Sequence, residues 1–200
     1  MINFIFRLLL SFNSTSLLII IYLVKEKKVF ISIFPGLEFL SYVPSFLCYL
    51  AYILIPVMLT GVSIYLSSYL GQDEFRKGTT SSIEHANNSF LPSYLGYFFV
   101  ALSINDPVTL GFVYLVLFVF TFLSQALYFN PLFLLYGFEF YNITTQNGAS
   151  VFLISRSKYK TPREVDIERA FRINNYTFIE KERYELYNSK NKHKRKKEVV

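Results

Sequence analysis

Cysteine, histidine and tryptophan are scarce in this chain of 200 residues, which contains one cysteine, two histidines and no tryptophan. A single cysteine, Cys48, cannot form an intramolecular disulfide, nor can it supply the dithiol of a membrane thiol oxidoreductase. The two histidines, His85 and His193, have no second type of metal ligand at a suitable spacing. We therefore expect no disulfide, no structural metal and no cofactor.

Charged residues are also few, and they are unevenly distributed. They make up 17% of the chain, below the roughly 25% of ordinary soluble domains, while hydrophobic residues make up 52%. Residues 1–130 hold 6 Lys/Arg and 6 Asp/Glu, whereas residues 131–200 hold 14 and 8 and so carry the whole net charge of +6. This division predicts a neutral, apolar first part and a basic, polar second part.

Long uncharged runs in the first part predict transmembrane helices, because a hydrocarbon core about 30 Å thick requires about 20 mostly apolar helical residues. Residues 43–70 and 108–128 are long enough. The apolar run 90–104 is shorter, at 15 residues, and we expect it to form a transmembrane hairpin with 108–128 across the turn Asn105-Asp106-Pro107.

Residues 8–24 predict a further helix, diluted at its start by hydroxyl residues and ending in the strong run LLIIIYLV. A cleaved signal peptide is the alternative interpretation, but it requires a small-residue cleavage site after the apolar region. Here the charged segment Lys25-Glu26-Lys27-Lys28 follows directly. We therefore expect a retained first helix and four transmembrane helices in all.

Four crossings place both termini on one side of the membrane, and the distribution of Lys and Arg indicates which side. With the termini in the cytosol, Arg7, Arg76, Lys77 and the 14 cations of residues 131–200 share that compartment. The positive-inside rule favours this orientation. Three cations then lie outside: Lys25, Lys27 and Lys28.

The predicted helices contain no ionisable group at membrane depth, which argues against a pump or an ion-coupled transporter. Ser63, Ser67 and Gly71 recur every four residues and predict one small-residue face for helix packing, within or between chains. The alternative is that this spacing arises by chance, since small residues are common in membrane helices.

The second part has the pattern of a small α+β module. Aromatic and β-branched residues in 138–145 and 149–155, separated by Asn147-Gly148, predict a β-hairpin. Thr161, Pro162 and Glu164 match a capping box that begins a short helix, which we expect to end at Arg172. Within it, Glu168 and Arg172 have the i,i+4 spacing of an ion pair.

Residues 176–180 predict a third strand. The predicted fold is thus an all-α membrane domain of four transmembrane helices, residues 1–129, followed by a cytosolic α+β module, residues 130–188. Some 50 residues are marginal for an independent fold, so we expect contacts with the membrane domain or with a partner to stabilise the module.

The last residues, 189–200, form a basic tail that we expect to be disordered. It can be a solvated tail, attract anionic lipids, or attract nucleic acid or an acidic partner, and the sequence does not separate these alternatives. The candidate contact residues for a partner or for lipid are Lys192, Lys194, Arg195, Lys196 and Lys197.

Catalytic signatures are missing, and we expect no catalytic residue. An intramembrane serine protease requires a histidine within the membrane, and both histidines lie outside the predicted helices. No glycine-rich phosphate loop and no metal-binding carboxylate cluster is present. His85 beside Glu84, in the polar loop 71–88, is the one acid–base pair in the sequence.

The layout resembles the membrane subunit of the Kiwa anti-phage defence system. The resemblance rests on four spans, the polar loop, the Asn105-Asp106-Pro107 turn, the exit segment 130–134 (NPLFL) and the aromatic segments 136–141 (YGFEFY) and 152–156 (FLISR). It implies a tetrameric, multi-pass protein of the bacterial inner membrane that senses infection and works with a cytosolic DNA-binding subunit. It implies no residue-level functional site.

Two functional hypotheses follow. The first is a non-enzymatic sensor or scaffold that recruits or signals to the cytosolic subunit through its C-terminal module, without direct nucleic-acid contact of its own. The alternative is a pore-forming or channel-type effector, in which several copies surround a pore lined by Ser63, Ser67 and neighbouring hydroxyls.

Overall fold

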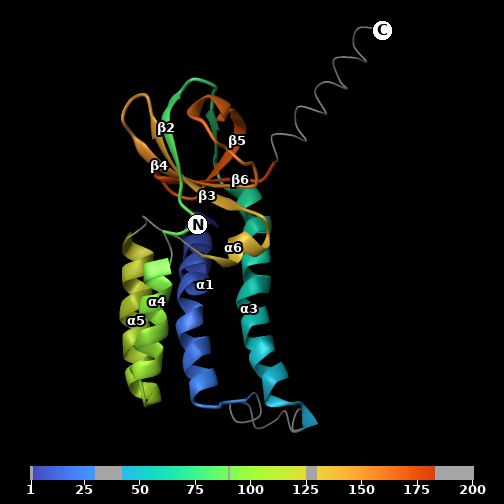
Figure 1. The fold of residues 1–200 in the computed structure, drawn as a ribbon, viewed down its shortest axis with the longest axis vertical. Helices are drawn as coiled ribbons and strands as arrows, with labels where there is room; N and C mark the ends of the chain where they lie inside the picture. The colour runs from blue at the N-terminus through green and yellow to red at the C-terminus, as the bar shows by residue number, and fades with distance from the viewer. Residues whose placement is uncertain (1, 30–41, 90, 125–129, 183–200) are drawn as a thin grey trace. The chain divides into compact units, whose positions relative to one another are not determined.

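The computed structural model describes residues 2–29, 42–89, 91–124 and 130–182. The chain divides into two compact units (Figure 1). The helical unit comprises Phe4–Tyr65 and Ser89–Leu132, and the sheet unit comprises Leu66–Asn88 and the chain from Phe133 onward, with Met1–Asn3. Each unit is thus built from segments that are separated in the sequence.

The helical unit contains α1 (Ile2–Lys25), α3 (Ser45–Leu66), α4 (Leu91–Ser103) and α5 (Pro107–Ser124). Within the described residues, three helices are long and apolar enough to cross a membrane, namely α1, α3 and α5. The expectation of four such helices is corrected, because α4 has only 13 residues, or about 20 Å of helix. The apolar run before the Asn105-Asp106 turn does not supply a longer helix.

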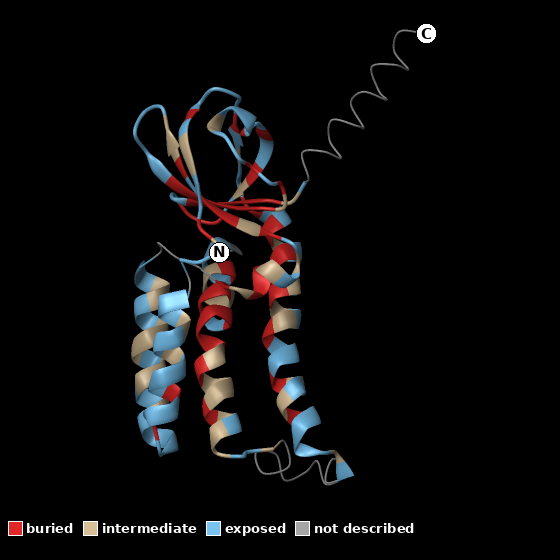
Figure 2. Ribbon diagram, in the orientation of Figure 1, coloured by how far each residue is buried: buried red, intermediate tan, exposed pale blue. Residues whose placement is uncertain are grey.

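Helix α1 packs against α4 and α5 along most of its length. Leu18 and Tyr22 of α1 bury their side chains with Ala101 and Ile104. Figure 2 shows buried residues on α1 and α3, whereas α5 has no buried residue in the single chain. The large apolar side chains of α5 that do not face α1, among them Phe112, Leu115 and Phe120, are therefore available to lipid or to another protein chain.

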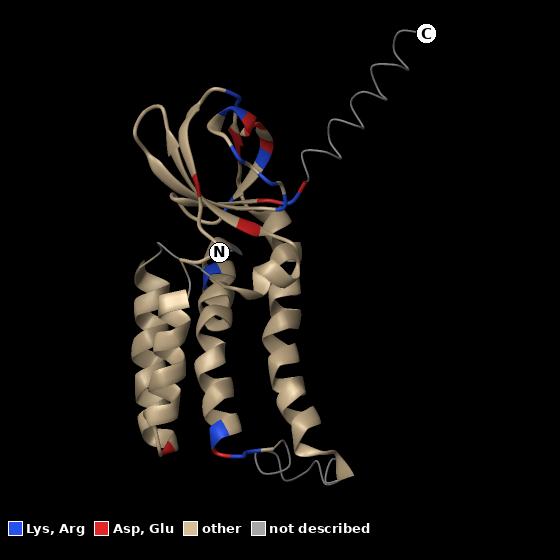
Figure 3. Ribbon diagram, in the orientation of Figure 1, with Lys and Arg blue, Asp and Glu red and all other residues tan. Residues whose placement is uncertain are grey.

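Two cations mark the ends of the apolar length of α1. Arg7 donates to the carbonyl of Phe122 at 3.3 Å, and the ammonium group of Lys25 donates to the carbonyl of Ile104 at 2.5 Å and to Asn105 at 2.9 Å. The 18 residue steps between these cations correspond to about 27 Å of helix, close to the thickness of a hydrocarbon core. Figure 3 shows the helices almost free of charge between their ends.

The sheet unit has six strands in the order β1-β5-β6-β4-β3-β2, and only β4 and β6 are parallel to each other. The strands are β1 (Gln72–Phe75), β2 (Thr80–His85), β3 (Glu139–Thr145), β4 (Ser150–Ser155), β5 (Ile167–Arg172) and β6 (Thr177–Glu180). Three short helical segments accompany them: η2 (Ser67–Tyr69), α6 (Leu132–Leu135) and η3 (Pro162–Glu164).

The order of the strands requires the sheet to curl. Strands β1 and β2 lie at opposite ends of the order, yet Phe75 and Thr80 are only five residues apart in the chain. Five residues reach at most about 17 Å, whereas the edges of a flat six-stranded sheet are about 24 Å apart. The two edges therefore approach each other at this turn, in agreement with the curled sheet of Figure 1.

The predicted hairpin is confirmed as β3 and β4, which pair from Glu139↔Ser155 to Thr144↔Ser150. Its turn differs from the two-residue type that Asn147-Gly148 predicts. The amide of Gly148 donates to the carbonyl of Thr145 at 3.0 Å, and Gly148 adopts a φ of 78°, whereas Asn147 keeps a negative φ. Glycine alone thus supplies the left-handed residue of a loop with three residues.

The predicted third strand is confirmed as β6, but the helix expected from Thr161 to Arg172 is wrong. Glu164 does accept hydrogen bonds from the amides of Lys160 at 2.8 Å and Thr161 at 3.4 Å, yet the helical turn ends at Glu164 and β5 follows. Arg172 pairs with Asp73 of β1 instead of Glu168. Pairing with β1 and β6 on either side overrides the local helical pattern.

The interpretation of residues 71–88 as a polar loop is also wrong, because they contain β1 and β2. These strands complete the sheet at its two edges, so the α+β module is not the single segment 130–188 that the sequence analysis expects. Both strands are short and polar, and their hydrogen-bonding partners lie more than 50 residues away in the sequence. No local pattern of apolar residues therefore identifies them.

Side chains from both faces of the sheet are buried. One cluster gathers Tyr141, Ile143 and Leu153 with Phe75 and Phe178, whose rings meet edge-to-face at 5.1 Å. On other positions of β3 and β4, Phe140 stacks on Phe152, and Phe133 of α6 meets Phe138 and Phe140 edge-to-face. The short helix α6 thereby anchors the start of the second chain segment to the sheet.

Candidate functional site

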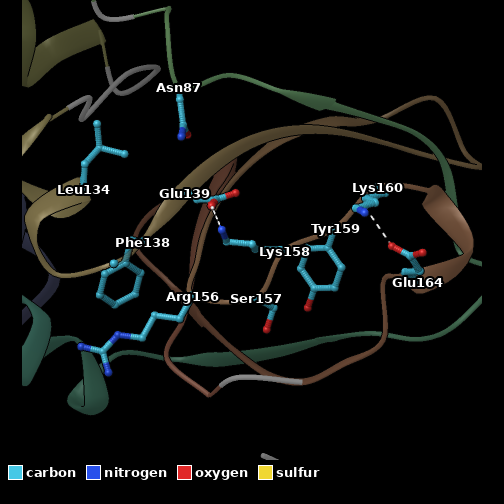
Figure 4. A pocket seen from close by; sticks show the side chains of 11 residues that line it. Asn87, Leu134, Phe138, Glu139, Arg156, Ser157, Lys158, Tyr159, Lys160 and Glu164 are labelled. Atoms are coloured by element: carbon cyan, nitrogen blue, oxygen red, sulfur yellow. Dashed lines mark hydrogen bonds and ion pairs between the residues drawn. The ribbon is translucent and has the colours of Figure 1, made fainter. Parts of the chain in front are cut away.

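The sheet unit contains a pocket of about 840 Å³ beside the ends of β3 and β4 (Figure 4). This volume falls within the roughly 300–1,000 Å³ that is typical of small-molecule sites. The lining includes three cations and two carboxylates in addition to apolar and amide groups. The lining residues are Asn87, Leu134, Gly137, Phe138, Glu139, Arg156, Ser157, Lys158, Tyr159, Lys160 and Glu164.

One segment, residues 155–160, which begins at the last residue of β4 and bends at residues 156, 157 and 160, supplies most of the polar groups of this pocket. Its side chains alternate between hydroxyls and cations in the order Ser-Arg-Ser-Lys-Tyr-Lys. The three hydroxyl residues are buried, whereas Lys158 and Lys160 are exposed and Arg156 is half-buried. Figure 4 shows Lys158 directed toward Glu139, while Ser157 and Tyr159 point away from it.

The three hydroxyls converge on the buried carboxyl group of Glu180, at the end of β6. Tyr159 donates to both Glu180 oxygens at 3.0 and 2.9 Å, Ser157 donates to Oε1 at 3.3 Å, and Ser155 forms a further short hydrogen bond. The parallel pairing of β4 with β6 places Ser155 opposite Glu180. Glu180 is only 4% exposed, so this cluster is inside the unit rather than on its surface.

Burial of Glu180 raises its pKa to about 7, despite the opposing effect of the hydrogen bonds from Ser155, Tyr159 and Ser157. The nearby charge of Glu182 raises the pKa further. Burial and the adjacent Glu180 charge likewise raise the pKa of Tyr159 well above its ordinary range. The cluster can therefore hold or release one proton near neutral pH while Tyr159 remains protonated.

Glu139 is the second carboxylate with several partners. It accepts a hydrogen bond from Tyr141 at 2.7 Å and lies 3.5 Å from the ammonium group of Lys158. Nε2 of His85 is 3.4 Å from the same carboxylate. His85 therefore lies against Glu139 of the neighbouring strand, whereas Glu84, its neighbour in the sequence, is on the opposite face of β2.

Arg156 lies at the apolar side of the pocket, and its guanidinium carbon is 4.7 Å from the centre of the Phe138 ring. This distance is that of a cation–π contact with the face of the ring. Nε of Arg156 is buried and has no hydrogen-bond partner among the described residues. The side chain thus carries a charge and a donor that the described part of the chain does not satisfy.

The residues singled out from the sequence lie elsewhere. The five cations of the tail, Lys192, Lys194, Arg195, Lys196 and Lys197, fall outside the described residues. Ser63 is buried in the helical unit within 3.5 Å of Asn13, Ser67 is buried in η2, and Gly71 lies in the segment before β1 with open space around its Cα. The structure places Ser63 alone of these three within α3.

No motif in the sequence marks Arg156, Glu139 or Glu180 as residues of a site. The alternation of hydroxyls and cations in residues 155–160 is a signal of a segment with one buried and one more exposed side. No signal in the sequence indicates that Glu180, 25 residues after Ser155, is the shared partner of its hydroxyls. Among the described residues, no group of three or more His, Cys, Asp or Glu side chains is arranged to hold a metal ion.

The fold defines a class of protein in which a set of long apolar helices, capable of crossing a membrane, is combined with a curled mixed sheet that contains a charged pocket. The sequence matches the family described as anti-phage protein KwaA over residues 6–179, so the chain belongs to the KwaA family of anti-phage proteins. This confirms the resemblance to the Kiwa membrane subunit. No curated protein and no solved structure gives a significant match.

Proposed function

We propose that this anti-phage protein is an oligomeric sensor or scaffold of the bacterial inner membrane, which recruits a soluble DNA-binding subunit through its sheet unit. The family supports the role in defence, and the long apolar helices support a position in the membrane. The exposed apolar side chains of α5, such as Phe112, Leu115 and Phe120, support contacts with lipid and with further copies of the chain.

The connectivity of the sheet supports an even number of membrane crossings. Strands β1 and β2 precede α4 and α5, whereas β3 to β6 follow them, and all six strands form one sheet. The chain between β2 and β3 must therefore return to the side of the membrane that it left. If α5 crosses, the shorter α4 crosses with it as a hairpin, with local thinning of the bilayer.

The same argument applies at the N-terminus, because α1 and α3 precede the sheet and form a second pair of crossings. The N-terminus and the sheet unit then share one compartment. The distribution of Lys and Arg supports the cytosol as this compartment, in line with the positive-inside rule. The proposal therefore retains two cytosolic termini although α4 is short.

The single observation that supports partner docking is the pair of sheet edges formed by β1 and β2. Each of these strands has only one neighbour in the described sheet. Ala86 donates its amide to Phe140 of β3 at 2.8 Å, so alternation directs the amides of His85 and Ile83 to the outer edge. Such an edge can pair with a strand of another protein.

This proposal is tested by a charge reversal at each edge. The full chain is expressed in bacteria with the soluble DNA-binding subunit, as wild type, Glu84→Lys on β2 or Glu74→Lys on β1. Glu168→Lys is the matched control, because Glu168 is also exposed but lies on β5, an internal strand. The amount of soluble subunit in the membrane fraction and the protection against phage are measured.

We expect at least one edge substitution to reduce both recruitment and protection severalfold, because an added lysine blunts strand pairing at an edge. Glu168→Lys should resemble the wild type. Equal amounts of chain in the membrane fraction confirm that insertion is unchanged. Undiminished recruitment by both edge variants would refute docking at the sheet edges.

A further inference from the structure

We propose that the pocket beside the ends of β3 and β4 binds a phosphate-bearing anion, held by Arg156, Lys158 and Lys160. This inference is independent of partner docking, because it concerns the interior lining of the pocket rather than the sheet edges. Three features of the lining support it: an unsatisfied arginine, a surplus of positive charge, and a set of hydrogen-bond donors.

Arg156 is the central group of the proposed site. Its guanidinium carbon lies 4.7 Å from the centre of the Phe138 ring, and its buried Nε has no partner within the described chain. Nor does Arg156 form an ion pair with any described carboxylate. Arginine presents paired N–H donors in a fork that matches two oxygens of one phosphate or carboxylate, so an anion in the pocket would satisfy this group.

The pocket has three cations and two carboxylates, so one positive charge of its lining is not offset. Glu164 is occupied by the backbone amides of Lys160 and Thr161, at 2.8 and 3.4 Å. The other carboxylate, Glu139, is shared among Tyr141, His85 and Lys158. The backbone amide of Lys160 and, more weakly, the charge of its side chain lower the pKa of the Glu164 carboxyl, so Arg156 is the pocket cation that has no carboxylate partner among the described residues.

A further cation lies close to Arg156 from another element of the sheet. Lys181 follows β6, and its pKa is lowered by burial and, secondarily, by the charge of Arg156. A second positive charge near Arg156 adds to the positive potential on this side of the pocket. Such a potential favours an anion with more than one negative charge.

The remaining donors define the ligand further. The side-chain oxygen of Asn87 accepts the amide of Phe140 at 2.8 Å, which fixes the side chain and leaves its NH₂ group as a donor. The volume of about 840 Å³ exceeds that of a lone phosphate ion and accommodates a substituent on it. A soluble phosphomonoester such as a nucleotide and the headgroup of an anionic phospholipid both have this chemistry.

The test uses the full chain purified in a neutral detergent at constant ionic strength. Inorganic phosphate and AMP are the soluble probes, and mixed micelles of phosphatidylglycerol or phosphatidylcholine are the lipid probes. Binding is measured by the rise in Tm with probe concentration and by broadening of the ³¹P resonance. The variants are Arg156→Gln and Lys160→Gln, and Arg76→Gln is the matched control in the turn at the opposite end of β2.

We expect saturable binding by the wild type and by Arg76→Gln, and at least tenfold weaker binding by Arg156→Gln and Lys160→Gln. Should Arg156→Gln lower the Tm in chloride alone, Lys160→Gln carries the test, because its side chain is exposed. Binding of AMP or phosphate assigns a soluble ligand, and binding of phosphatidylglycerol alone assigns a lipid headgroup.

Two results would overturn the proposal. The first is the absence of saturable binding for all the phosphate-bearing probes, including phosphatidylglycerol. The second is equal binding by the wild type, Lys160→Gln and a folded Arg156→Gln, since the phosphate would then be bound elsewhere on the chain.

Discussion

The buried carboxyl group of Glu180 should make the stability of the sheet unit depend on pH, and Glu180→Gln should remove this dependence. Burial raises the pKa of Glu180 from 4.5 to about 7. Below pH 4.5 the group is protonated in both the folded and the unfolded chain. Between pH 4.5 and 7 the unfolded chain releases the proton while the folded chain retains it, so stability falls as the pH rises and becomes constant above 7.

The magnitude follows from the two pKa values. A difference of about 2.5 corresponds to about 3 kcal/mol of unfolding free energy lost between pH 4.5 and 8. Glutamine has nearly the same shape as glutamate and no charge, so the Glu180→Gln variant should not lose this unfolding free energy as the pH rises. The difference in stability between variant and wild type should therefore change by about 3 kcal/mol over this range, in favour of the variant at high pH.

Hydrogen exchange of the β4 and β6 amides, followed by mass spectrometry on the full chain in detergent, measures this difference locally. The ratio of wild-type to variant exchange rates should rise roughly a hundredfold from pH 4.5 to 8, since about 1.4 kcal/mol corresponds to a factor of ten. Comparison at each pH cancels the intrinsic pH dependence of exchange.

Glu74→Gln is the matched control, because Glu74 is exposed and its ion pair with Arg76 lies at the surface. Its rate ratio to the wild type should stay constant. A constant ratio for Glu180→Gln as well would show that Glu180 does not titrate in this range, and the account of its burial would be refuted.

Two further substitutions test one local interaction within each unit. Gly148→Ala should lower the unfolding free energy of the sheet unit by about 1 kcal/mol, because alanine is strained at a φ of 78°. The measurement is hydrogen exchange of β3 and β4, and the control is Gly71→Ala, which should have little effect because Gly71 has open space and an ordinary φ. Asn130→Ala should lower the free energy of unfolding by about 1–2 kcal/mol and with it the Tm in detergent. The substitution removes a buried 2.9 Å hydrogen bond to Thr60 and a 3.0 Å hydrogen bond from the Leu132 amide. The exposed Asn142→Ala is its control, and equal Tm values for these two variants would contradict the assigned role of Asn130.

Local features of the sequence predict the elements whose interactions are local. The β3–β4 hairpin follows from alternating aromatic and β-branched residues around a glycine that can adopt positive φ. The helices α1, α3 and α5 follow from long uncharged runs, because an α-helix satisfies the backbone hydrogen bonds of such a run within the segment itself. The family resemblance likewise rests on segments that can be read along the chain.

Strand β5 shows where local reasoning fails. Its residues, IERAFR, begin after a genuine capping box and contain helix-forming residues at helical spacing. The strand forms because β1 and β6 provide hydrogen-bonding partners on both sides, and Arg172 meets Asp73, 99 residues away in the sequence. Such long-range partners leave no mark in a local window.

For this protein, the sequence by itself determines the apolar helices, the hairpin and the alternation of hydroxyls and cations in residues 155–160, since each depends on the spacing of neighbouring residues. Only the tertiary structure decides that residues 72–85 belong to the sheet and that Glu180 collects the three hydroxyls. It also leaves Arg156 unsatisfied beside Phe138. These features depend on which distant segments pair, and pairing is governed by the burial and hydrogen bonding of the whole sheet rather than by any one segment.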